Sequence, residues 1–229
     1  MAGRFLGGRP AVFDERVQVV LPPVTEDQTH VPVTVDARDL GRADEILLIA
    51  DLNPFPLTLR LEPVAAASFI ALRMKIEQGT PIRAAVRQGD LWHVGGRYLD
   101  AAGGYSVPPV VEKKTDWKSL GNTRAEIWRE PEGLRLRLRI THPMDNGMIP
   151  GVSVFFIETL AVSDAAGAPM AKLTLSEAIA DDPTLTLLLD APPSGDVLTI
   201  AGRNTGGMDF SARVPIPPGA TARRREGRL

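Results

Sequence analysis

The chain has 229 residues, a net charge of −2 and no cysteine. The near-neutral charge and the scattered basic residues argue against nucleic-acid binding, and no apolar run approaches the ~20 residues that span a bilayer. The lack of cysteine excludes disulfides, a thiolate nucleophile, iron–sulfur clusters and cysteine-ligated zinc. The length favours two domains, and the 21 glycines and 20 prolines between short apolar segments favour an all-β fold.

The first half of the chain is predicted to be a β-sandwich of about seven strands. Alternation of apolar and polar residues marks half-buried strands, and the continuous apolar run 45–51 indicates a strand that is buried on both faces. Gln88-Gly89-Asp90 has the composition of a hairpin turn. The predicted strands are 15–21, 31–36, 45–51, 57–62, 68–77, 81–88 and 91–99.

A polar segment of mixed charge, 111–122, is the predicted linker, and a second set of strands comes after it. We expect strands at 123–128, 134–141, 152–164, 168–175, 184–189, 196–201 and 208–214. The prediction is therefore two immunoglobulin-like sandwiches in tandem, with domains at 1–110 and 123–229.

The segment 134–141 has the cleanest alternation in the chain. Its leucines face one way, and Arg135, Arg137 and Arg139 face the other. These arginines would form either a docking surface for an acidic partner or a solvated sheet face balanced by carboxylates on the neighbouring strand. The second interpretation is favoured.

The stretch from Arg97 to Pro109 differs from the strands around it. Gly103 and Gly104 give the backbone unusual freedom, and the two prolines at its end stiffen the chain. Tyr105 and Ser106 lie between the glycines and the prolines. A hinge that carries a chosen side chain at the end of a strand is suited to presenting that side chain to partners.

Residues that could support catalysis are few. None of the three histidines has the spacing of a local zinc motif, so no metal and no cofactor is expected. His142 and Asp145 lie at a predicted strand end and could form a functional turn, although a structural histidine is favoured. Asp181 and Asp182 are discounted as an acid–base pair, since adjacent strand residues point to opposite faces and Asp-Pro opens turns. No catalytic residue is assigned.

Several segments together resemble a known family. In the first half they are Val31-Pro32-Val33-Thr34-Val35, Asn53-Pro54-Phe55-Pro56, Arg73-Met74-Lys75-Ile76, Ile82-Arg83-Ala84-Ala85-Val86 and Ala101-Ala102-Gly103-Gly104-Tyr105-Ser106-Val107-Pro108; in the second they are His142-Pro143-Met144-Asp145-Asn146-Gly147-Met148, Phe156-Ile157-Glu158 and Asp182-Pro183. The first half resembles the SoxY-type sulfur carriers, and the second half resembles their partner SoxZ. The single chain is most similar to the fused SoxYZ-like carriers associated with quinoprotein dehydrogenases.

The resemblance implies a non-enzymatic periplasmic carrier that works with other proteins of a Sox-like or quinoprotein dehydrogenase-associated system. It leaves a homo-oligomer open. The N-terminus lacks the apolar region of a secretory signal, so the protein is either cytosolic or has lost a leader. In the family a cysteine on a Gly-Gly arm holds the sulfur intermediate. Tyr105 occupies that position here, and a phenol cannot form a persulfide or thiosulfonate.

The segment around Tyr105 is open to four interpretations. The first is a carrier-derived scaffold that presents Tyr105 to a partner. The second is a true sulfur carrier whose natural cysteine is replaced at position 105. The third is an unrecognised metal- or histidine-dependent enzyme that uses His142, Asp145 and Tyr105. The fourth is an ordinary surface turn in which Tyr105 is buried.

Overall fold

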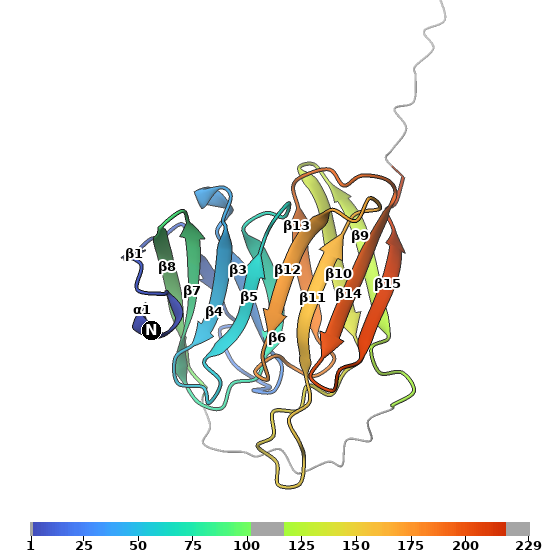
Figure 1. Ribbon diagram of the computed structural model, residues 1–229. Coiled ribbons are helices and arrows are strands. Elements are labelled where there is room, and N and C mark those ends of the chain that lie inside the picture. The colour runs from blue at the N-terminus through green and yellow to red at the C-terminus, as the bar shows by residue number, and fades with distance from the viewer. Residues whose placement is uncertain (1, 102–116, 219–229) are drawn as a thin grey trace, which may run out of the picture.

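The protein is a two-layer β-sandwich, and the computed structural model describes residues 2–101 and 117–218 of it. One layer is a nine-stranded sheet in the order β1-β8-β7-β4-β5-β12-β11-β14-β15. The other is a six-stranded sheet in the order β2-β3-β6-β13-β10-β9. Figure 1 shows the two sheets face to face, with the first half of the chain on the left and the second half on the right. The predicted all-β sandwich class is confirmed.

The strands lie close to where the apolar periodicity places them. In the first half the elements are α1 (Ala2–Phe5), β1 (Ala11–Phe13), β2 (Gln18–Val20), β3 (Val31–Asp36), the 3-10 turn η1 (Arg38–Leu40), β4 (Glu45–Ala50), β5 (Leu57–Glu62), β6 (Phe69–Met74), β7 (Thr80–Gln88) and β8 (Leu91–Leu99). In the second half they are β9 (Thr123–Glu130), β10 (Gly133–Ile140), β11 (Ile157–Ser163), β12 (Pro169–Leu175), β13 (Thr184–Leu189), β14 (Val197–Asn204) and β15 (Asp209–Pro215).

Three details differ from the prediction. The strand expected at 152–164 begins only at Ile157, because the residues before it belong to a long loop. The strand expected at 68–77 ends at Met74. The short strand β1 was not predicted, since all three of its residues are exposed and show no alternation. It pairs in parallel with β8.

The core runs through both halves without interruption. Every second residue of β10 and β13 is buried, as are Val31, Val33 and Val35 of β3, and these side chains join one apolar cluster between the sheets. A second, smaller cluster lies on the outer face of the nine-stranded sheet. There Leu6 covers Trp92, whose indole N–H donates to the Leu6 carbonyl at 3.1 Å.

Strands from the two halves pair with each other at two seams. At the tight seam, β5 and β12 are in register over four residue pairs, from Lys172 opposite Glu62 to Leu175 opposite Leu59. At the open seam, the ladder between the described strands β6 and β13 contains one pair, Ala71 opposite Thr186. Both sheets therefore continue from one half into the other. The predicted domain bounds and the linker 111–122, half of which lies outside the described residues, stay predictions.

Candidate functional site

The chain leaves β8 at one end of the sandwich, which we call the loop end. It comprises the Asp51–Pro56 turn, the residues after β6 and β8, the loop 141–156 and the turn before β13, and the loop projects from the lower edge in Figure 1. Gly103, Gly104, Tyr105 and Ser106, the predicted carrier arm, lie outside the described residues. The structure therefore describes the base from which that segment starts.

His142 is packed into this base as a structural residue. It is 1% exposed, and its Nδ1 accepts a hydrogen bond from the Met144 amide at 3.1 Å. In the neutral ring the proton is therefore on Nε2. The His142 amide donates to an Asp182 carboxylate oxygen at 3.1 Å. The sequence favoured a structural histidine at this position, and the ring accepts a hydrogen bond from a turn amide.

Met144 connects this turn to the first half of the chain. Its side chain is fully buried, and its φ of 49° lies in the left-handed region that a non-glycine residue seldom adopts. The ammonium of Lys75, just beyond β6, donates to the Met144 carbonyl and forms an ion pair with Asp181 at 2.9 Å. Lys75 thus links the two halves, a role that a lone lysine in the sequence did not reveal.

The Asn53-Pro54-Phe55-Pro56 turn is attached to the same place. The Asn53 side-chain amide donates to the Lys75 carbonyl at 2.7 Å, and its oxygen accepts from the Glu77 amide at 3.2 Å. Asn53 is buried. One of the segments that carries the family resemblance therefore helps to hold Lys75 in position.

Asp145, the second residue of the predicted functional turn, is in the loop 141–156. Its backbone forms a two-way bridge with Phe155, with N–O distances of 2.7 and 3.0 Å. Phe155 also stacks on His142, with ring centroids 4.6 Å apart. The fold thus brings His142 and Asp145 to one feature, the closed base of the loop.

The tip of this loop exposes apolar side chains. Gly147 has a φ of 73°, which allows the chain to reverse after Asn146. Beyond it four apolar residues are between 37% and 49% exposed: Met148, Ile149, Val152 and Val154. Trp117 is 64% exposed and packs against Phe155 with ring centroids 5.7 Å apart. Apolar surface of this kind is common where proteins contact one another.

Asp181 and Asp182 do not form a carboxylate pair. Asp181 binds Lys75, while Asp182 binds Arg139 at 3.1 Å and caps the His142 amide. Asp182 has a left-handed φ of 47°, which turns the two side chains toward different partners. Both carboxylates stabilise the loop end.

The other two histidines also have local partners. His93 Nδ1 lies 2.8 Å from an Asp14 oxygen, and His30 lies 3.1 Å from Asp27. The pKa of Asp14 is held well below its usual range. The largest cause is hydrogen bonding from the Arg16 guanidinium, and the next is the hydrogen bond from the Arg16 backbone amide. This cluster fastens β1 to β8 and lies at the edge strand of the nine-stranded sheet.

Within the described residues, no group of three or more histidine, aspartate or glutamate side chains could hold a metal ion. None of the helices in the described part of the chain is long and apolar enough to cross a membrane.

Comparison with known proteins finds similarity mainly in the first half of the chain. No curated protein matches the chain. Solved structures that resemble it include the sulfur carrier protein SoxY from Chlorobium limicola f thiosulfatophilum (21% identity, 44% of this chain and 92% of that chain, TM-score 0.39). A glycosyl hydrolase family 2 member from Bacteroides cellulosilyticus (14%, 86% and 28%, TM-score 0.26) also resembles it. TM-scores this low support no inference. Residues 2–104, however, match the family model of the sulfur oxidation protein SoxY. The first half of the chain is therefore similar to the SoxY family of sulfur oxidation proteins.

Proposed function

We propose that the protein is a non-enzymatic SoxYZ-like scaffold that presents Tyr105 to partner proteins and carries no covalently bound sulfur. The observation that carries this proposal is the boundary of the family match. The SoxY match ends at Gly104, the next residue is tyrosine, and none of the 229 residues is a cysteine. A phenol with a pKa near ~10 is a poor nucleophile toward sulfane sulfur at neutral pH.

The loop end supports a presenting role. It is held together by contacts between the two halves, so the segment that contains Gly103, Gly104, Tyr105 and Ser106 starts from a well-packed base. The exposed apolar tip of the loop 141–156 offers a partner additional contact area near that base. On this proposal the partners belong to a Sox-like or quinoprotein dehydrogenase-associated system in the periplasm, and the second half is SoxZ-like.

The absence of sulfur loading is tested by intact-mass spectrometry. The full chain and a Tyr105→Cys variant are incubated with polysulfide and then desalted. We expect the mass of the native chain to stay unchanged and the variant to gain one or more sulfur atoms. Sulfur on the native chain would contradict the proposal. A genomic cysteine codon at position 105 would instead favour a true carrier with a replaced cysteine.

Presentation is tested by binding. Partners are captured from the native host on the full chain, and their affinity is then compared with that for a chain that lacks residues 103–109. We expect weaker binding without the segment. A Tyr105→Phe variant serves as the matched control for the hydroxyl group, and equal binding by the full and shortened chains would exclude an arm that presents Tyr105.

A further inference from the structure

The outer face of the six-stranded sheet contains a hollow of about 290 Å³ at the open seam. It lies between the two halves of the chain and is lined by strands from both. The residues lining it are Pro32, Val33, Thr34, Ala71, Leu72, Arg73, Trp128, Arg135, Arg137, Thr184 and Thr186. Three of these are arginines, and none is a carboxylate.

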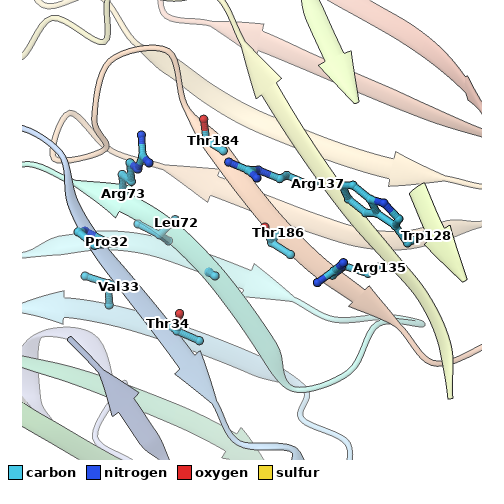
Figure 2. A pocket seen from close by; sticks show the side chains of 11 residues that line it. Pro32, Val33, Thr34, Leu72, Arg73, Trp128, Arg135, Arg137, Thr184 and Thr186 are labelled. Carbon is cyan, nitrogen blue, oxygen red and sulfur yellow. The ribbon is translucent and has the colours of Figure 1, made fainter. Parts of the chain in front are cut away.

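The register of the sheet explains why the face is hollowed. Thr34, Ala71, Thr186 and Arg137 lie opposite one another across β3, β6, β13 and β10. Three of these four side chains are small, so they rise only a short way above the sheet and form the floor of the hollow. Larger side chains stand on either side of it. Figure 2 shows Arg135 and Arg137 extending from β10 toward the β13 residues Thr186 and Thr184, with Arg73 on the far side of the seam.

The charges around the hollow are only partly compensated. Arg135 lies 3.2 Å from Glu130 and over the Trp128 ring at 4.8 Å, and Arg139 pairs with Asp182. The structure records no side-chain ion pair or hydrogen bond for Arg73 or Arg137 within the described residues. Glu126 lies opposite Arg137 in the ladder, yet the two form no ion pair there.

The positions of the arginines define the chemistry of a ligand. Arg135 and Arg137 are two residues apart on one strand, so their side chains leave the sheet about 6.7 Å apart. Arg73 is two strands away from β10, at roughly 10 Å. An extended peptide spaces its alternate side chains by about the same 6.7 Å. A guanidinium also binds a carboxylate through two parallel hydrogen bonds.

We propose that this hollow docks an extended acidic segment of a partner protein, with alternate carboxylates bound by Arg135 and Arg137 and a further one by Arg73. The wide, shallow shape and the exposure of the arginines suit a polypeptide chain. The small residues on the floor leave room for its backbone. The surface joins both halves, so it exists only in the assembled sandwich.

This docking surface is independent of the arm around Tyr105. It is built from described strands on a sheet face, whereas the arm starts at the loop end. Deleting residues 103–109 therefore leaves the docking prediction unchanged, and the two proposals fail separately.

The test uses a fluorescently labelled peptide with glutamate at alternate positions and the full chain. Binding is measured by anisotropy, first at low salt and then at rising salt. We expect saturable binding that weakens with salt, because exposed charges are screened. A peptide with glutamine in place of glutamate should not bind. A double variant that combines Arg73→Gln with Arg137→Gln should weaken binding by about tenfold or more.

Two further variants keep the result interpretable. Arg213→Gln, an exposed arginine on β15 of the other sheet, removes the same charge and should leave binding unchanged. Thr186→Glu places a carboxylate on the floor of the hollow without removing an arginine, and it should abolish binding. Equal weakening by Arg213→Gln would mean nonspecific attraction and overturn the proposal. Displacement of the peptide by sulfate at constant ionic strength would assign the hollow to small oxyanions and overturn it as well.

Discussion

The two seams differ in the length of their ladders and in the face on which the paired residues lie. At the tight seam the paired leucines Leu59, Leu61, Leu173 and Leu175 all point into the core and are at most 4% exposed. At the open seam the paired residues are Ala71 and Thr186, both partly exposed on the outer face. The same two halves thus meet once through a ladder of four pairs and once through a single pair of small residues on the outer face.

The two sheets contribute differently to the contact between the halves. The tight seam joins the halves into one core, because removing paired leucines from water supplies the main favourable free energy of folding. The open seam also buries apolar side chains, since Ile70, Leu72, Leu185 and Leu187 are at most 4% exposed in the same core. Its small outward-facing side chains leave the hollow between the arginines. Both sheets therefore stabilise the contact between the halves, and the six-stranded sheet also carries the proposed docking surface.

Of the substitutions that test this comparison, Leu173→Ala should lower the free energy of unfolding the most. The side chain is 3% exposed, and truncating a buried leucine costs about 2–5 kcal/mol. Urea unfolding of a chain in which Trp92 is the only tryptophan would report on the first half. We expect its midpoint to fall although Leu173 is in the second half. Thr186→Ala at the open seam is the control, with an expected loss below about 1 kcal/mol. An unchanged Trp92 midpoint would mean that the halves unfold separately.

Lys75→Met should have the next largest effect, since Lys75 forms a largely buried ion pair between the halves. Methionine keeps the apolar stem but removes the ammonium from Asp181 and from the Met144 carbonyl. We expect a loss of about 1–3 kcal/mol in the free energy of unfolding, because the Lys75 side chain is only 15% exposed. Lys172→Met, an exposed lysine at the tight seam, should change stability by no more than about 0.5 kcal/mol. Equal losses of stability in the two variants would mean that Lys75 does not stabilise the contact between the halves.

The sequence predicted the strands well because period-two alternation is a local signal. Val31, Val33 and Val35 mark their strand without knowledge of its neighbours. The seams were not predicted, since alternation says which face a residue takes and not which strand lies beside it. The sequence around Leu173 or Thr186 does not indicate that either residue pairs with a strand of the other half.

The candidate site was predicted in part. The arginine stripe was placed on one face. Among the described residues, carboxylate partners were found for Arg135 and Arg139 but not for Arg137. Lys75 was missed because its partners are a backbone carbonyl and a carboxylate far away in the chain. The role of Tyr105 at the position of the family cysteine stays a prediction that rests on the family resemblance alone.

Asp14→Asn should have a smaller, pH-dependent effect at a site far from both seams. The pKa of Asp14 is lowered by Arg16, so its contribution to stability is present above its unfolded pKa of ~3.9 and is lost as the pH falls through the folded value. We expect the variant to be less stable at neutral pH and to have a flatter stability curve below about pH 4. Urea unfolding by circular dichroism at several pH values would show this, whereas parallel curves would contradict it.

Arg137→Gln should have the smallest effect on folding. The side chain is exposed and contributes no ion pair among the described residues, so the free energy of unfolding should change by less than about 0.5 kcal/mol. Thermal unfolding of Arg137→Gln and Leu173→Ala under the same conditions would compare a substitution on the outer face of the open seam with one in the core of the tight seam. A loss above about 1 kcal/mol would mean that the guanidinium belongs to the joint. An unchanged stability would mean that Arg137, which has no ion pair among the described residues, is dispensable for folding and is available to an acidic partner.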